Sequence, residues 1–308
     1  MERMMWEYDG FIAKAQLYFA RAADHRTAEN GVLAHWLLLG LEFLLRAPLA
    51  KVHPTLLADM NGESIMAAAG YPKPNGHPTS IALKTVVERL GVIVPAFTKE
   101  RAADVTYLAG LRNAEAHSSS SPYEQGVELW LPHFTRVVEV VCDHLELEPA
   151  DILGDALLDH GRALVDAADK RLIHEVTQRI KAAAMIRNSL SNEELIVRRA
   201  RIGTIFRGRA GLNLIDEAVE QVRCPACAED IPLELRSVRS TNERIEDDCI
   251  YRDVVYVATG LSCPVCTLRL EGTAEIHAAG IQQQYLRTEQ ELLEDRYVGY
   301  GEPEYGND

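Results

Sequence analysis

The sequence predicts a mainly α-helical protein, in which a helical bundle is followed by a helical linker and a small β-rich module. Three observations carry this prediction. Apolar residues recur at helical spacing from residue 9 to about residue 200, short alternating runs replace that pattern from residue 222, and two Cys-x-x-Cys pairs stand within the alternating segment. We place the boundaries at 1–150 for the bundle, 151–215 for a basic connecting region, 216–282 for the β-rich module and 283–308 for an acidic tail.

Two helices open the bundle, at 9–23 and 28–47. The second is nearly all apolar but carries His35, Glu42 and Arg46, which a membrane-spanning helix would bury at high cost. We therefore expect a central core helix and no membrane partner. The first residues lack a basic segment followed by an apolar one, so we expect no secretory signal and a cytoplasmic location.

The next 100 residues alternate loop and helix signals. Residues 48–80 are rich in Pro, Gly and Asn and predict a mobile loop. Two helices should follow, one capped by Thr79 or Ser80 and ended by Gly91, the other at 99–117 behind Thr98. After the break S-S-S-S-P, a fifth helix is expected at about 123–146, bent at Pro132.

A basic stretch lies within this acidic chain. The formal net charge of −14 argues against a protein coated in basic surface for nonspecific nucleic-acid binding. Helix is predicted again over 151–200, and between 170 and 211 ten Lys and Arg residues face only three Glu. Two interpretations stay open: the stretch guides a nucleic acid through its phosphates, or it is the solvated face of a linking helix.

The two cysteine pairs predict a metal site. Cys224 with Cys227 and Cys263 with Cys266 have the spacing with which paired turns complete a tetrahedron of thiolates around zinc. Four thiolates leave no open position, so we expect a structural Zn²⁺ that folds a zinc ribbon rather than one that performs chemistry. The alternative is that these cysteines are buried small hydrophobes or a redox pair.

The rest of the β-rich region is predicted from local pattern. The segment between the cysteine pairs suggests an extended hairpin around 240–253, and residues 267–277 read as a further strand. Cys249 and Cys142 fall outside the metal pattern, and Cys142 is expected in the core. Beyond residue 287 we expect a short helix to about 296 and then a poorly ordered acidic tail.

An arginine and a histidine close the helix at 99–117, in the hexapeptide RNAEAH. Arg112 and His117 are separated by about 140° around an ideal helix, so they do not share a face. Their heads could meet only if the helix loosened in its last turn or if a second copy of the segment supplied the partner. The alternative is that both residues are solvated and complement the helix dipole, which favours a protonated imidazole.

RNAEAH resembles the R-(N/D/H)-x3-H form of the R-x(4–6)-H motif of the HEPN superfamily, with Asn113 at the polar position. The apolar run at 35–49 resembles the long second helix of that family, and Glu42 is its acidic residue. The resemblance covers about residues 9–148. It implies a small helical bundle that acts as a dimer, with two motifs meeting in one site. Glu42 would support that site, or else pair with Arg46 one helical turn away.

The resemblance implies a metal-independent endoribonuclease, and the residue chemistry fits. RNA carries its own nucleophile in the 2′-OH, so cleavage needs a proton acceptor and donor of near-neutral pKa and a cation for the phosphorane. We assign the first role to His117, the second to Arg112, and an orienting role to Asn113. The expected products are a 2′,3′-cyclic phosphate and a 5′-OH, formed without a divalent ion.

A family subset extends the motif with a tyrosine that a partner nucleotidyltransferase modifies; Ser119 stands at that position, so this toxin–antitoxin pairing is not supported. Defence or stress response is the expected role, because many family members act there. The first alternative is a noncatalytic HEPN scaffold that binds RNA, nucleotide or protein, with the zinc ribbon recruiting a regulatory partner. The second is a zinc-ribbon regulator of transcription, against which stand the acidic charge and the lack of a clear helix-turn-helix.

Overall fold

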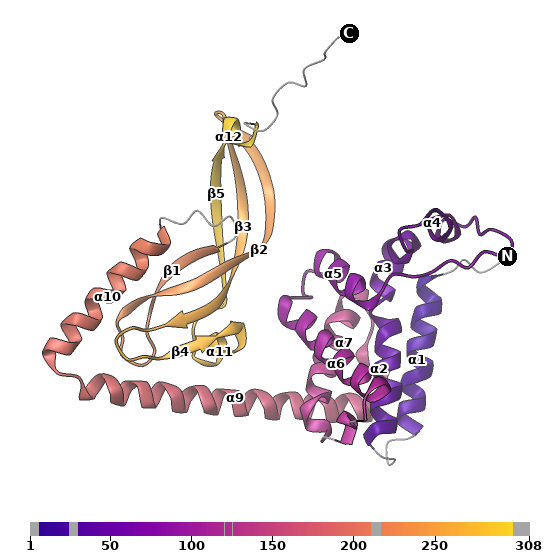
Figure 1. Cartoon of the computed structure of the whole chain (residues 1–308), viewed down its shortest axis with the longest axis horizontal. Coiled ribbons are helices and arrows are strands. Elements are labelled where there is room, and N and C mark those ends of the chain that lie inside the picture. The colour runs from indigo at the N-terminus through magenta and orange to yellow at the C-terminus, as the bar shows by residue number, and fades with distance from the viewer. Residues whose placement is uncertain (1–5, 25–29, 120, 125, 211–216, 298–308) are drawn as a thin grey trace, which may run out of the picture. The chain divides into compact units, whose positions relative to one another are not determined.

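A computed structural model of the chain describes residues 6–24, 30–119, 121–124, 126–210 and 217–297. The chain divides into two compact units, Met1–Ala168 and Asp169–Asp308 (Figure 1). The first unit is helical, and the second contains an antiparallel sheet. This order of a helical region and a β-rich module confirms the coarse prediction.

The first unit is a bundle of helices joined by short connections. Its α-helices are α1 Tyr8–Asp24, α2 Asn30–Leu44, α3 Ala47–Val52, α4 Gly62–Ala68, α5 Leu83–Ile93, α6 Lys99–His117, α7 Leu131–Leu145 and α8 Pro149–Leu153, with 3-10 helices at Pro54–Leu57, Pro122–Glu124 and Val127–Leu129. The long helix α9, Asp155–Ser189, begins in this unit and continues into the second.

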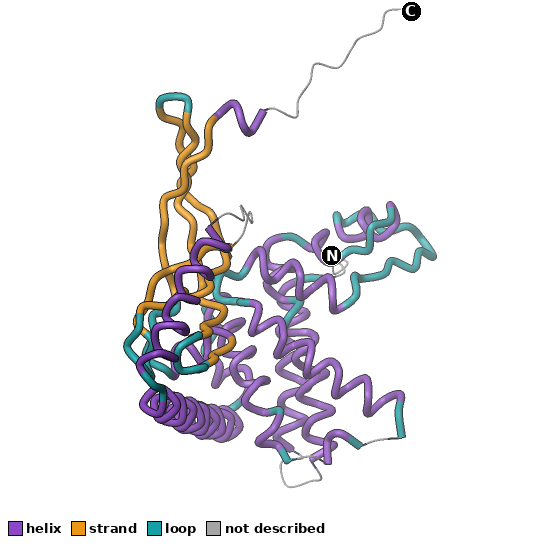
Figure 2. Tube along the Cα trace, turned by 60° about the vertical axis from the view of Figure 1, so that its left-hand side comes forward, coloured by secondary structure: helices purple, strands orange, loops and turns teal. Residues whose placement is uncertain are grey.

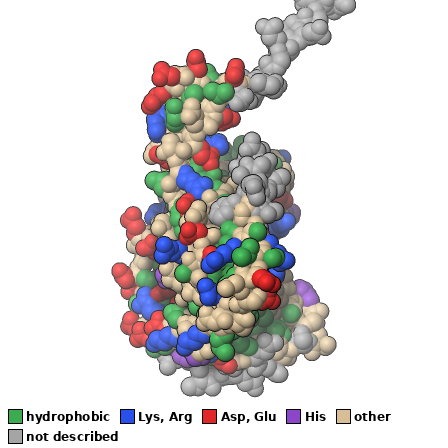
Figure 3. Space-filling model, turned by 90° about the vertical axis from the view of Figure 1, so that its left-hand side faces the viewer, with side chains coloured by type: hydrophobic (Ala, Val, Ile, Leu, Met, Phe, Trp, Pro, Cys, Tyr) green, Lys and Arg blue, Asp and Glu red, His purple; other side chains and the backbone are tan. Residues whose placement is uncertain are grey.

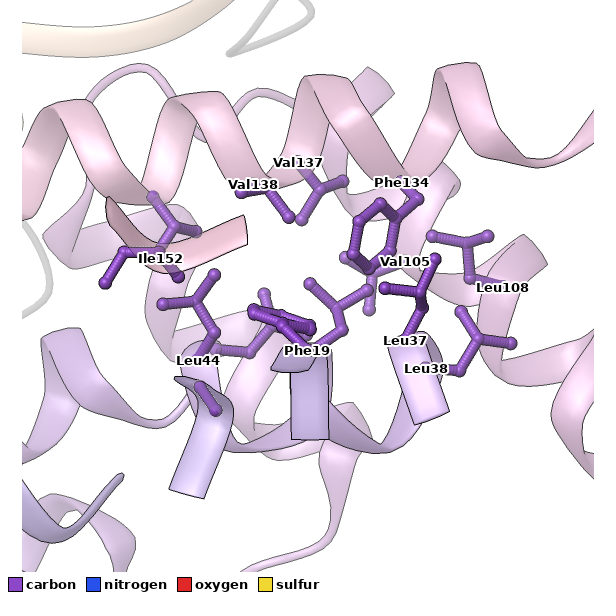
Figure 4. Close-up of a cluster of buried hydrophobic side chains, with 14 of the residues drawn as sticks. Phe19, Leu37, Leu38, Leu44, Val105, Leu108, Phe134, Val137, Val138 and Ile152 are labelled. Carbon is purple, nitrogen blue, oxygen red and sulfur yellow. The ribbon is translucent and has the colours of Figure 1, made fainter. Parts of the chain in front are cut away.

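Helix α2 lies at the centre of the first unit, as its apolar sequence predicts. Leu37 and Leu44 of α2 are fully buried, and Phe19 of α1 meets Phe134 of α7 edge to face with ring centroids 5.8 Å apart (Figure 4). By length and composition alone residues 31–52 could cross a membrane, but 61% of an apolar 18-residue window within them is buried in the structure. The burial fits a core helix of the bundle.

The prediction of a mobile loop over residues 48–80 is wrong in part. This segment holds α3, a 3-10 helix and α4, while residues 71–78 form the loop that their composition predicts. A local cap and a longer-range hydrogen bond order it: Asn61 caps α4 by accepting from the Ser64 N–H, and the Ser64 hydroxyl accepts from the Thr79 N–H. Local composition cannot reveal the second of these contacts.

Two predicted helix starts also need correction. Helix α5 starts after Ala82 rather than at Thr79 or Ser80, and it ends at Ile93 rather than Gly91. Helix α7 starts at Leu131, so Pro132 lies in its first turn and causes no bend. Helix α6 has the predicted bounds, although the Thr98 side chain makes no capping hydrogen bond.

The second unit packs helices against a five-stranded antiparallel sheet. After α9 it contains α10 Asn192–Ala210, β1 Glu217–Arg223, β2 Asp230–Glu246, β3 Cys249–Ser262, β4 Arg269–Glu271, α11 Gly272–Ala278, β5 Gln284–Leu292 and α12 Leu293–Tyr297. The strand order is β1-β2-β3-β4, and β5 pairs with the N-terminal part of β3, from Cys249 to Val257. Figure 2 shows the long strands running side by side.

Two local predictions in this unit are wrong. Residues 267–277 were expected as one strand, but only Arg269–Glu271 is strand, and α11 begins at Gly272, whose φ of +73° turns the chain. The segment at 287–296 was expected as a helix, but β5 occupies Gln284–Leu292 and only Leu293–Tyr297 is helical. The expected disorder beyond residue 297 lies outside the described residues.

Candidate active site and metal centre

Helix α6 carries the Arg-His motif and stays regular to its end. The N–H of Ser118, which follows the last helical residue, still donates to the carbonyl of Ala114 at 3.0 Å. The helix therefore does not loosen before His117, and the angle of about 140° between Arg112 and His117 persists. One copy of the chain does not bring these two side chains together.

Arg112 points toward α2, where Glu42 holds it. The guanidinium forms an ion pair with the Glu42 carboxylate, and only 33% and 22% of the two side chains are exposed. Arg46 also lies beside Glu42, at 4.0 Å between Nη1 and Oε2, and donates to the Glu42 carbonyl at 2.7 Å. Glu42 therefore contacts both Arg112 of the motif and Arg46.

The other two motif residues are exposed. Asn113 accepts a hydrogen bond from Nη2 of Arg112 at 3.2 Å, so it helps to orient the guanidinium. His117 makes no hydrogen bond or ion pair with any residue that the structure describes, and it occupies the C-terminal turn of α6. Arg112 is thus fixed in place, while His117 is accessible from solvent.

A small hollow adjoins the Glu42–Arg112 pair, between α2, α5 and α6. Seven of its nine lining residues are apolar, and Glu42 and Arg112 supply its charge. Ion pairs bordering apolar surface are shielded from water, so their Coulomb attraction exceeds that of an exposed pair. The pair is a firm contact between the motif helix and the core helix.

Tyr123 is a neighbour of this site that the sequence analysis missed. It follows the serine break, and only 2% of the residue is exposed. Burial, with a further contribution from the charge of Glu115, raises the pKa of Tyr123 to about 12, and Arg112 opposes that rise. Its hydroxyl has no hydrogen-bond partner among the described residues. No periodic or motif signal marks a tyrosine of this kind.

A second polar cluster joins α6 to α7. Nδ1 of His133 lies 2.6 Å from Oδ1 of the buried Asp104, and Arg101 pairs with the other carboxylate oxygen at 3.0 Å. Asp104 therefore balances two potential cations at once. No sequence motif marks these residues, and Asp104 and His133 are 29 residues apart in the chain.

The four cysteines of the predicted metal site do come together. Their Sγ atoms all lie within 4.8 Å of one another, with Cys224 and Cys266 at 3.6 Å and Cys227 and Cys263 at 3.5 Å. Cys224, Cys263 and Cys266 are buried, and Cys227 is half-buried. The arrangement could hold one metal ion.

Two turns of matching geometry present these cysteines. The first joins β1 to β2 and the second joins β3 to β4, so both lie at the same end of the sheet. In each turn the residue after the second cysteine has positive φ, 59° at Ala228 and 64° at Thr267, and donates its N–H to the carbonyl of the first cysteine at 2.9 Å. Such tight turns leave the sulfur atoms pointing toward one centre.

Backbone N–H groups face the sulfur atoms, as a site for an anionic ligand set requires. Sγ of Cys224 accepts from the N–H groups of Ala226 and Cys227. The neighbouring thiols of Cys263 and Cys266, together with these N–H groups, lower the pKa of Cys224 to about 2, whereas burial raises the pKa of Cys227 to about 12. Like charges oppose further ionisation in the cluster, and a bound dication would remove that opposition.

Arginines of α10 fasten that helix to both cysteine turns. Nη1 of Arg198 donates to the carbonyl of Val265, inside the second turn, at 2.8 Å. Nε of Arg199 donates to the Glu229 carboxylate, just after the first turn, at 2.8 Å. In addition, Arg179 of α9 pairs with Glu275 of α11 at 2.6 Å.

These contacts bear on the predicted basic stretch at 170–211. Arg179, Arg198 and Arg199 are committed to contacts inside the second unit, while the side chains of Arg207 and Arg209 lie outside the described part. On the face drawn in Figure 3, Lys and Arg side chains are interspersed with Asp, Glu and apolar ones. The stretch contributes to packing as well as to surface charge.

Comparison with protein-family models, with curated proteins and with solved structures found no match to this chain.

Proposed function

We propose that the first unit is a metal-independent endoribonuclease of the HEPN type that acts as a homodimer. The observation that carries this proposal is the separation of Arg112 and His117 on a helix that stays regular to its end. Arg112 is fixed against α2 while His117 is exposed, so two chains are needed to place both groups on one phosphate. A two-fold dimer supplies each group from the opposite copy.

The proposed reaction is transesterification within RNA. His117 accepts the proton of the 2′-OH, the 2′-oxygen forms a bond to phosphorus, and the bond from phosphorus to the 5′-oxygen breaks. The imidazolium formed in this step then returns a proton to the departing 5′-oxygen. Arg112 donates hydrogen bonds to the phosphorane oxygens as charge builds there. The products carry a 2′,3′-cyclic phosphate and a 5′-OH.

Glu42 and Asn113 would position the arginine. A guanidinium has five N–H donors, so bonds to Glu42 and Asn113 leave others for a phosphate. A group held in advance loses less freedom when the substrate arrives. Glu42 is a positioning residue in this scheme, because it acts through Arg112 rather than on the RNA.

We further propose that the four cysteines bind one structural Zn²⁺. Bonds of about 2.3 Å from zinc to sulfur give a tetrahedron whose edges are about 3.8 Å, close to the Sγ separations of 3.5 and 3.6 Å. Cys224, Cys227, Cys263 and Cys266 fill all four positions and leave none for a substrate. The second unit would then be a zinc ribbon that recognises RNA or a regulatory protein.

A noncatalytic RNA-binding or protein-binding scaffold is the second candidate. The Glu42 carboxylate already neutralises Arg112 in the single chain, which favours this candidate. A scaffold predicts RNA binding that survives His117→Ala, and no cleavage products from any form of the protein.

The deciding experiment is cleavage of mixed cellular RNA in EDTA, with zinc content measured before and after. Wild type should cleave, Arg112→Ala and His117→Ala should not, and His160→Ala should match wild type because His160 is an exposed histidine outside the motif. End-group analysis should find cyclic phosphates. Intact RNA with folded, zinc-loaded wild type would refute the ribonuclease proposal.

A mixing experiment tests the composite site. Arg112→Ala and His117→Ala chains, inactive separately, should regain part of the wild-type activity when they are unfolded together and refolded, because mixed dimers contain one complete pair of groups. Two active single-variant preparations, or an active monomer in sedimentation, would contradict the composite site.

A further inference from the structure

Three aromatic rings form a stack between α1 and α2. The ring of Tyr18 lies between those of Trp36 and Phe43, with centroids 5.7 and 5.4 Å apart and interplanar angles of 16° and 10°. Trp36 and Phe43 are seven residues apart on α2, so they share one stripe of that helix. We call these three residues the aromatic ladder.

Two cations lie beside the aromatic ladder. Nζ of Lys14 is 4.9 Å from the centroid of Phe43, and the guanidinium of Arg21 is 5.0 Å from the centroid of Trp36 and 5.4 Å from that of Tyr18. Neither cation forms an ion pair with a carboxylate in the described part of the chain, in contrast to Arg112 or Arg162.

The ladder is on the outer side of the helix pair. Its rings are half-buried, whereas the opposite sides of α1 and α2 supply fully buried residues such as Phe19 and Leu37. Leu17 and Val32, from the same two helices, are 49% and 37% exposed. Packing within the unit therefore buries the three rings only in part.

We propose that the aromatic ladder with Lys14 and Arg21 is a binding surface for single-stranded RNA. Exposed aromatic surface stacks on unpaired bases of any sequence, and flanking cations neutralise the phosphates between them. The two cations lie two helical turns apart on α1, roughly 10.5 Å, so they can contact different phosphates of one strand. A second copy fits less well, because a two-fold contact through this face would bring cations together.

This inference rests on the proposed function and deepens it, because it names single-stranded RNA as the substrate class. Phe43 of the ladder directly follows Glu42, which holds Arg112. A strand on the ladder would therefore lie on a face of α2 adjoining the face that carries the motif contact. Both surfaces are within the first unit.

The test is binding of a short 2′-O-methyl oligonucleotide, which cannot be cleaved, followed by fluorescence anisotropy over a range of salt concentrations. The double variant Lys14→Gln/Arg21→Gln should bind about tenfold more weakly. The slope of the logarithm of the binding constant against the logarithm of salt concentration should become shallower by about 1.4, or about 0.7 for each lost phosphate contact. Lys84→Gln, which removes one positive charge at an exposed lysine of α5, should bind as wild type does. Trp36→Leu should also weaken binding.

Two results would overturn the inference. One is a double variant that binds the single strand with wild-type affinity; the other is a variant that loses folding stability or dimerisation but not RNA affinity, which would assign the ladder to helix packing or to a second copy. Tighter binding of a duplex than of the single strand would contradict the substrate class.

Failure of the ladder and failure of the ribonuclease proposal can be told apart. Wild type that binds the oligonucleotide through the ladder but leaves cleavable RNA intact would refute the nuclease and keep the binding surface. Wild type that cleaves RNA, with ladder variants that bind and cleave equally well, would refute the binding surface alone.

Discussion

The carboxylate of Glu42 on α2 holds the guanidinium of Arg112 on α6, and the same carboxylate lies 4.0 Å from Nη1 of Arg46. One carboxylate therefore contacts two guanidinium groups where the central helix α2 meets the motif helix α6. Because α2 is fixed by the core, the position of Arg112 is set by the packing of the bundle rather than by a loop.

Glu42→Gln should reduce the free energy of unfolding by about 1–2 kcal/mol, because burial already lowers the pKa of Arg46 and the change leaves two half-buried guanidiniums without a carboxylate. Urea unfolding of the full chain measures this. Glu88→Gln is the control: its partner Lys84 is 87% exposed, so the loss should stay within about 0.5 kcal/mol. Equal losses in the two variants would contradict a special role for Glu42.

Gly40→Ala should destabilise the first unit by about 1–3 kcal/mol, since an added Cβ would overlap the ring of Phe19, which is itself packed on Phe134. Gly91→Ala in α5 has open space around its Cβ and should instead gain up to about 1 kcal/mol from helix propensity. Thermal unfolding of both variants gives the comparison. A neutral Gly40→Ala would mean that α1 and α2 can separate at little cost.

If the four cysteines bind Zn²⁺ as proposed, its removal should unfold the sheet of the second unit and leave the first unit folded. Cys224→Ser should then bind no zinc, whereas Cys249→Ser should bind one zinc per chain because Cys249 lies outside the cluster. Metal analysis and limited proteolysis measure the two effects. Full zinc content in Cys224→Ser would exclude the four-thiolate site.

Alkaline pH should destabilise the first unit. Burial raises the pKa of Cys142 from 9.0, and that of Tyr123 from 10.0, to about 12 in the folded chain. A raised folded pKa gives stability that is complete below the unfolded pKa and lost as pH rises through the folded pKa, so the loss should run from about pH 9 to pH 12. Denaturation series across this range measure it.

Tyr123→Phe separates the tyrosine from the thiol. The variant should lose less stability than wild type between pH 10 and 12, because it has no phenol to ionise. At neutral pH its free energy of unfolding should be within about 0.5 kcal/mol of the wild-type value, since the hydroxyl has no partner among the described residues. An unchanged alkaline profile would show that Tyr123 is not buried in solution.

Those parts of the structure that depend on local sequence could be predicted from the sequence alone. The predicted bounds of α6, between Thr98 and the serine break, match the structure although Thr98 makes no side-chain cap, and the cysteine spacing predicted which four sulfur atoms would meet. It did not predict that Glu42 would contact both Arg46 and Arg112, because the second contact depends on how α2 packs against α6.

Strand β5 shows where local reasoning fails. Its residues, QYLRTEQEL, have good helix propensity and no apolar alternation, because neither face of the strand is fully buried. Nine residue pairs with β3, from Cys249↔Leu292 to Val257↔Gln284, decide the outcome instead. Pairing with a strand already formed overrides intrinsic preference here.

The cysteine turns set an order for folding during synthesis. The first turn leaves the ribosome 36 or more residues before the second, counted from Cys227 to Cys263, and β5 follows later still. The helical unit precedes all of them and has its own core, so it can fold while the metal ligands are still incomplete. In a nascent chain the ion pair between Glu42 and Arg112 would thus form before the sheet exists. Any effect of the second unit on the first would begin only after the sheet has folded.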